Sequence, residues 1–231
     1  MKTLGIIGGV GPLATMYYGD MLVRLTDAEK DQDHINMIIL NDTNIPDRTA
    51  YIVDPTKTNP VPVLQQDAQQ LEAMGAEVIT IPCNTAHTFF KEIQSAVNVP
   101  VIHMINETVQ RAAAEGAIRV GILATTGTIQ AGVFQQSCME AGLIPLLPDE
   151  EIQQDVMSVI YDQVKAGRPT DRKQWEKITK AMETLECERI ILGCTELSIV
   201  KKELQLDYRF LDALRVLAET AIVQCGGKIR N

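Results

Sequence analysis

Two cysteines of this sequence stand in closely similar surroundings. Cys83 lies in the segment VITIPCNTA (78–86), and Cys194 lies in RIILGCTEL (189–197), 111 residues further along the chain. Each follows a short apolar run typical of a buried strand and precedes a segment with helical character. The carboxyl end of a parallel strand is where α/β sheets bind ligands, and the N–H groups of a following helix favour a thiolate. A lone cysteine of this kind is an ordinary core residue, but two at equivalent places are candidates for chemistry.

Two thiols that reach one cleft from opposite sides suit the inversion of a stereocentre. That reaction needs a base on one face of a Cα–H bond and an acid on the other, and a cysteine serves as either when its pKa is tuned. It needs no metal and no organic cofactor in principle. The chain has five cysteines and three histidines, with no CxxC pair and no zinc-ligand spacing. We therefore expect no metal site, and we interpret the other thiols as ordinary residues: Cys138, Cys187 and Cys225.

The elements that position these thiols are predicted from hydrophobic patterning. Continuously apolar runs, as expected of parallel strands covered on both faces, occur at 4–7, 37–40, 78–81, 99–102, 120–123, 143–147 and 190–192. Apolar residues at helical spacing predict helices around 64–71, 152–164, 175–185 and 214–222. The alternation predicts an α/β protein with mainly parallel sheets. Residues 41–62, rich in Asn, Asp, Thr and Pro, are predicted to form a long functional loop.

The order of these signals occurs twice. A glycine turn follows a strand in GIIGGVGP (5–12) and again in GILATTGT (121–128), 116 residues later, close to the spacing of the two cysteines. Near-equal offsets in the same order predict two similar lobes. We expect two pseudo-symmetric lobes, each a mainly parallel sheet flanked by helices, with the active site in the cleft between them. Residues 1–98 with 209–231 are assigned to the first lobe, and residues 99–208 to the second.

Composition excludes several classes of protein. The 231 residues carry a formal net charge of −9, with 45% hydrophobic and 22% charged residues. A chain of this length buries a sizeable core without disulfides. The acidic balance counts against nucleic acids and anionic membrane surfaces as partners. No apolar run approaches the length of a membrane span, and the first residues lack a signal peptide, so we expect a cytoplasmic protein.

Four motifs, GIIGGVGP, IPCNTAH, LATTGT and GCTEL, resemble the cofactor-independent aspartate/glutamate racemase superfamily, and most closely its aspartate racemase branch. The resemblance spans nearly the whole chain. It implies two pseudo-symmetric α/β lobes, with Cys83 and Cys194 as the two acid/base thiols between them. It implies that Asn84 and Thr85 bind the substrate α-carboxylate, and that other residues line the same pocket: Val10 (often Met in relatives), Thr126, Thr128 and Thr195.

A distal substrate carboxylate needs a cation. Arg48 lies in IPDRT (45–49), which resembles the aspartate racemase loop, and a guanidinium holds a carboxylate through two hydrogen bonds. The resemblance implies that Lys165 is the second cation, on the other lobe. Glu196 is expected to contact the substrate, to adjust Cys194 or only to complement a helix N-terminus. His87 either tunes Cys83 or makes a structural hydrogen bond.

Two further patterns are compatible with a nicotinamide-dependent oxidoreductase. Gly9 to Ala14 fits GxGxxA after a strand, and Tyr161-x-x-x-Lys165 resembles the catalytic pair of short-chain dehydrogenases. Neither explains the repeated cysteines. We therefore predict a cofactor-independent amino-acid racemase whose small-molecule substrate is aspartate, assembled as a homodimer. Alternatives are glutamate or broad-specificity racemisation, a related dicarboxylate isomerase or decarboxylase, and a non-catalytic carboxylate-binding protein.

Overall fold

A computed structural model describes residues 1–230 and contains two parallel β-sheets. The first sheet has the strand order β2-β1-β3 and the second has the order β5-β4-β6-β7, with every pairing parallel. The predicted α/β class is therefore confirmed. The strands are β1 (Leu4–Gly8), β2 (Met37–Asn41), β3 (Val78–Thr80), β4 (Arg119–Ala124), β5 (Ile144–Leu146), β6 (Arg189–Gly193) and β7 (Phe210–Asp212).

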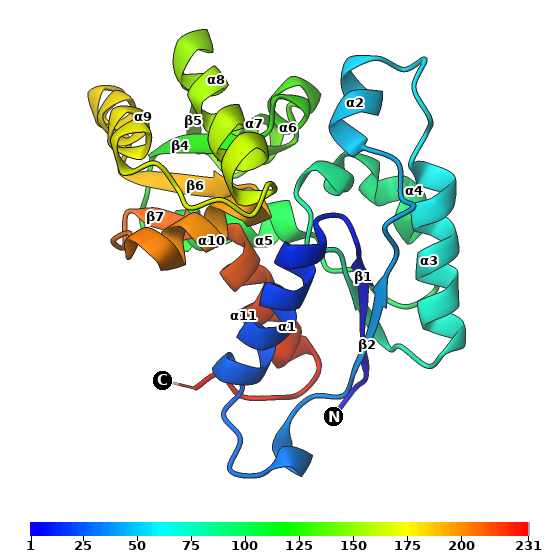
Figure 1. The fold of residues 1–231 in the computed structure, drawn as a ribbon. Coiled ribbons are helices and arrows are strands. Elements are labelled where there is room, and N and C mark those ends of the chain that lie inside the picture. The colour runs from blue at the N-terminus through cyan, green and yellow to red at the C-terminus, as the bar shows by residue number, and fades with distance from the viewer. Residues whose placement is uncertain (231) are drawn as a thin grey trace.

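Helices cover both faces of each sheet (Figure 1), which is why the central strands are apolar along their whole length. The α-helices of the first half are α1 (Pro12–Leu25), α2 (Arg48–Val53), α3 (Val61–Ala73), α4 (Phe90–Gln94) and α5 (Met104–Ala114). Those of the second half are α6 (Thr126–Ala131), α7 (Val133–Glu140), α8 (Glu150–Ser158), α9 (Arg172–Thr184), α10 (Thr195–Leu204) and α11 (Ala213–Gln224). Short 3₁₀ helices are η1 (Asp31–Asp33) and η2 (Thr85–Phe89), and η3 (Val159–Val164) is a π-helix that continues α8.

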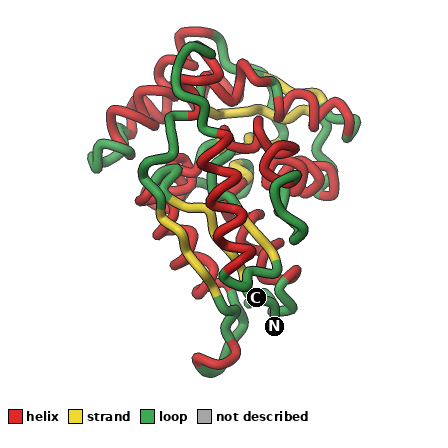
Figure 2. Tube along the Cα trace, turned by 90° about the vertical axis from the view of Figure 1, so that its right-hand side faces the viewer, coloured by secondary structure: helices red, strands yellow, loops and turns green. Residues whose placement is uncertain are grey.

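The two sheets repeat one arrangement. In each, the first strand of the lobe lies at the centre, the second lies on one side and the third on the other. The fourth position is occupied by β7 beside β6 in the second sheet, and by a single parallel bridge between Ile79 and Val101 in the first. In Figure 2 the strands accordingly gather in an upper and a lower group. This repetition matches the two pseudo-symmetric lobes expected from the sequence.

The chain crosses between the lobes after each fourth strand position. After Val101, α5 packs its buried face against the second sheet, and after β7, α11 packs against the first. The two crossing helices contact each other. The division at 98/99 and 208/209 stays a prediction. If Val101 is counted with the first sheet and β7 with the second, to which they are paired, both boundaries lie a few residues closer to the C-terminus.

Three local expectations differ from the structure. Residues 99–102 form only the bridge at Val101, the strand β7 was not expected, and the predicted loop 41–62 contains the helix α2. Short elements of this kind are decided by tertiary contacts more than by local patterning. Among residues 1–230, no helix has the length and apolar character needed to cross a membrane.

Candidate active site

The two repeated cysteines lie at equivalent ends of equivalent strands. Cys83 follows β3 and precedes η2, and Cys194 follows β6 directly and is the N-cap residue of α10. Both thiols are free and buried, with exposed fractions of 7% and 6%. Both line one small cavity between the lobes. The structure therefore brings together the two thiols that the sequence singled out.

The loop that carries Cys83 is fixed by a buried histidine. The N–H of Met104 donates to His87 Nε2 at 3.1 Å, so the ring proton lies on Nδ1, which donates to the carbonyl of Cys83 at 2.9 Å. Burial, and to a smaller extent the neighbouring His103, lower the pKa of His87 to about 4. His87 is thus neutral near pH 7, and its contacts support the structural hydrogen bond rather than a charge that tunes the thiol.

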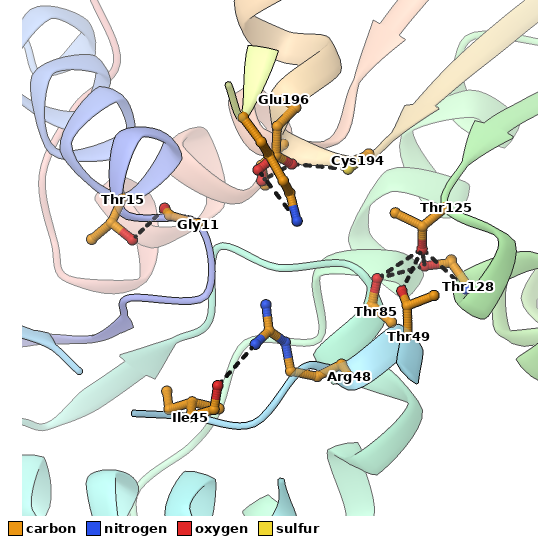
Figure 3. Close-up of polar contacts among 12 residues, drawn as sticks. Gly11, Thr15, Ile45, Arg48, Thr49, Thr85, Thr125, Thr128, Cys194 and Glu196 are labelled. Atoms are coloured by element: carbon orange, nitrogen blue, oxygen red, sulfur yellow. Dashed lines mark hydrogen bonds and ion pairs between the residues drawn. The ribbon is translucent and has the colours of Figure 1, made fainter. Parts of the chain in front are cut away.

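A carboxylate borders Cys194. The thiol donates a hydrogen bond to Oε2 of Glu196 at 3.0 Å (Figure 3). The Thr195 hydroxyl donates to the same oxygen at 3.2 Å. Nζ of Lys165 lies 4.0 Å from the other carboxylate oxygen. Burial and the negative charge of Glu196 raise the pKa of Cys194 well above the usual value, although Lys165 opposes this.

Arg48 enters the cavity from a short helix rather than from an open loop. Asp47 caps α2 by accepting a hydrogen bond from the N–H of Ala50 at 2.7 Å, which places Arg48 at the first helical position. The Arg48 guanidinium donates to the carbonyls of Ile45, at 3.3 Å, and Pro46, at 3.0 Å. Its buried Nε has no partner within residues 1–230. Although burial lowers the pKa of Arg48, negative charge on Cys83 and Asp47 raises it above the usual value.

Lys165 follows the π-helix η3 on the opposite lobe. Its ammonium lies 4.2 Å from the centre of the Tyr161 ring, close enough for a cation–π contact. Burial lowers the pKa of Lys165, but the nearby Glu196 and Cys194 more than offset this and raise it. The wider turn of a π-helix often occurs at functional sites, and here it presents Tyr161 and Lys165 to the cavity together.

Only some of the residues expected around the α-carboxylate line the cavity. Asn84, Thr85 and Thr195 line the cavity, as does Val10 from the β1–α1 turn. Both side-chain polar atoms of Asn84 are buried, and among the described residues they have no hydrogen-bond partner. A buried amide in that condition is costly unless a ligand or water satisfies it.

Two expected residues do not line the cavity. Thr128 lies behind it, where its hydroxyl hydrogen-bonds to those of Thr85, at 2.8 Å, and Thr125, at 3.0 Å (Figure 3). The N–H of Thr126 donates to the sulfur of Met157, and its side chain is not part of the lining. Thr125 takes the expected place because it is the N-cap of α6, one position before the first helical residue.

Sequence reasoning missed other lining residues: Asp47, Thr49, Thr125 and Tyr161. The sequence distinguishes Tyr161 only as part of a dehydrogenase-like pattern. Asp47 lies within IPDRT, and its position before a helix is a capping signal that could have revealed α2. A more open hollow beside the cavity shares four of its lining residues: Asp47, Arg48, Lys165 and Glu196.

The three remaining cysteines lie elsewhere. Cys138 and Cys225 are buried in separate apolar clusters, and burial raises the pKa of each to about 11. Cys187 is partly buried against the second sheet's core. Residues 1–230 contain no group of three or more His, Cys, Asp or Glu side chains arranged to hold a metal ion.

One buried thiol from each of two similar α/β lobes, in a cavity with an arginine and a lysine, is the arrangement expected of an isomerase that moves a proton at carbon. A model of the Asp/Glu/Hydantoin racemase family matches residues 7–221. The chain belongs to this family and is an amino-acid racemase.

Similar proteins agree with this assignment. The solved structure of Picrophilus torridus aspartate racemase is 30% identical, with a TM-score of 0.85, and the match covers 100% of this chain and 96% of that one. The broad specificity amino-acid racemase RacX of Bacillus subtilis is 26% identical over 95% of this chain and 96% of its own. A glutamate racemase of Corynebacterium kroppenstedtii is 31% identical over 60% of this chain and 48% of its own.

Proposed function

We propose that this protein interconverts L- and D-aspartate without a cofactor, by proton transfer at Cα between Cys83 and Cys194. The observation that supports this most directly is that both thiols line one buried cavity together with Arg48 and Lys165. One thiolate removes the Cα proton, and the other thiol delivers a proton to the opposite face. The two thiols exchange these roles when the substrate has the other handedness.

The α-carboxylate is held, in this proposal, by donors at the carboxyl ends of the strands. Asn84, Thr85 and Thr195 line the cavity beside the two thiols, and the amide of Asn84 is buried without a partner within residues 1–230. Donors that are already oriented stabilise the negative charge that develops when Cα loses its proton. Thr128 supports Thr85 from behind through their hydrogen bond, with Thr126 in the adjoining turn.

The distal carboxylate is bound by Arg48 and Lys165. The Nε of Arg48 is buried without a partner among the described residues, and the Lys165 ammonium faces the same cavity from the other lobe. A carboxylate between them would satisfy both groups, since a guanidinium and an ammonium each form strong charge-assisted hydrogen bonds with it. The 30% identity to the Picrophilus aspartate racemase across the whole chain also supports aspartate.

Racemisation of a broader set of amino acids is the second candidate. It is favoured by the 26% identity to the broad-specificity racemase of Bacillus subtilis over almost the full length of both proteins. Glutamate is a further alternative, since part of the chain is similar to a glutamate racemase. These alternatives share the two thiols and differ in what occupies the space near Arg48 and Lys165.

The deciding experiment incubates the protein with L- or D-amino acids in deuterated water without added cofactor. Optical rotation and Cα deuterium are followed for aspartate, glutamate, alanine and an uncharged bulkier amino acid. Inversion with deuterium uptake for aspartate, at a kcat/KM well above the others, supports the proposal. Comparable values for all four substrates would replace it by broad specificity. No exchange with any of them would overturn it.

The remaining parts of the proposal concern where and how the protein works. A homodimer and a cytoplasmic location were expected from the sequence, and a reducing compartment suits two thiols that must stay unoxidised. Size-exclusion chromatography with light scattering at micromolar concentration tests the homodimer, because a mass near twice the 25.5 kDa of the chain is expected. A species at the mass of one chain would contradict it.

A further inference from the structure

The carboxylate of Glu196 contacts one of the two thiols and not the other. The Cys194 sulfur lies 3.0 Å from Oε2 of Glu196, and both side chains are buried. Thr195 Oγ1 donates to the same oxygen. Because a carboxylate oxygen only accepts hydrogen bonds, the hydrogen in the contact with Cys194 belongs to the thiol.

The other charged groups near Cys194 leave this contact in place. From η3, Lys165 lies 4.0 Å from the second oxygen of Glu196, with Tyr161 beneath its ammonium. From the first lobe, Cys83, Asp47 and Arg48 line the far side of the cavity. The charge in direct contact with the Cys194 sulfur is therefore negative. Burial and Glu196 raise the pKa of Cys194, with Lys165 opposing them.

Cys83 has a different neighbour. Among the hydrogen bonds of residues 1–230, none joins its sulfur to a carboxylate, and Arg48, from the same lobe, lines the cavity with it. The two thiols are buried to nearly the same extent, so burial does not distinguish them. The difference lies in the neighbouring group, which is the carboxylate of Glu196 for Cys194 and the guanidinium of Arg48 for Cys83.

We propose that Glu196 is a positioning residue that keeps Cys194 protonated in the empty site, so that the resting enzyme holds Cys83 as the base and Cys194 as the acid. This rests on the proposed racemase function. In the first half of turnover the Cys83 thiolate takes the Cα proton, and the electron pair of that C–H bond stays on the substrate carbanion. Cys194 then gives its proton to the opposite face of Cα. The resting form returns when Cys83 releases its proton to water and Cys194 takes one up from water.

One enantiomer therefore reacts with the resting form and the other with the form in which the proton has moved. Because L- and D-aspartate have equal free energies, kcat/KM must be equal in the two directions whatever Glu196 does. The preference has to be measured in the free enzyme, without substrate. A direct observable is the rate at which each sulfur reacts with an alkylating agent, since the thiolate is the nucleophile.

The test is alkylation by iodoacetamide at limiting modification, with the rate at each cysteine measured by mass spectrometry from pH 6 to 10. In the wild-type protein Cys83 should react at least about tenfold faster than Cys194 near pH 7.5, because the contact with Glu196 keeps Cys194 in the less reactive thiol form. Glu196→Gln should speed the reaction at Cys194 by about tenfold or more and move its pH midpoint downward. The rate at Cys83 should change less than about twofold.

Three variants keep this test decisive. Glu196→Asp retains the charge and should leave Cys194 slow, whereas Glu203→Gln, on the same helix but bonded to Thr170, should change neither rate. Lys165→Met removes the opposing cation and should slow Cys194 further, which tests the same electrostatics if Glu196→Gln fails to fold. Equal wild-type rates at Cys83 and Cys194, or an unchanged Cys194 rate in Glu196→Gln, would overturn the proposal. Since no substrate is present, a failure of deuterium exchange would reject the racemase function without deciding this result.

Discussion

Cys83 and Cys194 follow equivalent strands of two similar sheets, yet different groups hold them in place. On the first lobe, neutral His87 fixes the backbone at Cys83, and the sulfur faces the cation Arg48. On the second lobe no histidine takes that role among the described residues, and the carboxylate of Glu196 accepts a hydrogen bond from Cys194 itself. The comparison shows that the fold repeats while its electrostatics do not. Two chemically identical side chains can thus begin turnover with different protonation.

Replacing either thiol tests whether the two sides are equally needed. We expect Cys83→Ser and Cys194→Ser each to reduce racemisation of aspartate by about 10³-fold or more, because an acid or base is lost on one face. Polarimetry from each enantiomer, with NMR of Cα deuterium, measures the effect. One-sided exchange can persist where the remaining thiolate still removes a proton.

A control for these variants is available in the second lobe. Cys138 is buried in the core away from the cavity, so Cys138→Ala should keep the wild-type rate. If Cys83→Ser or Cys194→Ser retained more than about a tenth of wild-type racemisation, the two-thiol mechanism would be wrong.

The pH dependence of folding stability tests whether the His87 ring that holds the Cys83 backbone is neutral. The pKa of His87 is about 4 when folded, below the value near 6.5 of an unfolded chain. The unfolded state thus binds more protons between these values, so stability rises with pH across this range and is lost as pH falls from 6.5 through 4. The full contribution of this one group amounts to about 3 kcal/mol.

The measurement is urea unfolding of wild type and His87→Asn between pH 4.5 and 7. The variant should lose most of the rise in unfolding free energy over this range. His34→Asn, near η1 and away from the cavity, serves as the matched control and should keep the wild-type slope. Identical slopes for wild type and His87→Asn would show that the buried ring does not titrate as described.

We expect the cations of the two lobes, Arg48 and Lys165, to contribute unequally to substrate recognition. Arg48 is buried and anchored by two carbonyls, whereas the Lys165 side chain is 28% exposed. We expect Arg48→Ala to lower kcat/KM for aspartate by about 100-fold and Lys165→Ala by about tenfold, since a desolvated charge interacts more strongly than a partly solvated one. Steady-state kinetics on aspartate and on an uncharged amino acid measure both. Equal losses on the two substrates would remove the residue from recognition of the distal carboxylate.

The smallest effect is expected where the two lobes touch through hydroxyl groups. Thr49 on α2 donates to Thr125 at 3.3 Å, and Thr125 also caps α6 by accepting a hydrogen bond from the N–H of Thr128. Thr49→Val should lower the unfolding free energy by about 1 kcal/mol, and Thr125→Val by about 1 to 2 kcal/mol, because the second change also removes a cap. Urea unfolding at neutral pH measures both. A Thr49→Val protein less stable than Thr125→Val would contradict this order.

The sequence was informative where residue type and position act together. Buried parallel strands must be apolar along their length, so β1, β3, β4 and β6 are predicted from the sequence, and β3 and β6 place Cys83 and Cys194 at strand ends. The inclusion of Arg48 and Lys165 came from the resemblance to a known family. A single arginine or lysine carries no distinguishing local pattern in the sequence.

The rest depends on contacts between distant segments. Which threonine of residues 125–128 faces the cavity depends on the residue at which α6 begins, and a shift of one position redirects the side chain by about 100°. The spacing in GCTEL does not specify that the Glu196 carboxylate turns back to Cys194. Its other oxygen lies near Lys165, which comes from another helix, and that contact cannot be read from the local sequence. The three-residue strand β7 pairs only because β6 supplies its partner.

The crossing helices have a consequence for any half-length relative of this chain. A single lobe ending in its own crossing helix would leave one face of its sheet partly uncovered, because α11 shares the covering of the first sheet with α1, and α5 shares that of the second with α7. Two copies of such a chain could each lend that helix to the other, which is domain swapping about a two-fold axis. The resulting pair would place one thiol from each copy at a shared interface. In the present protein the same two-fold exchange takes place within a single polypeptide, which leaves the two thiols free to acquire different neighbours.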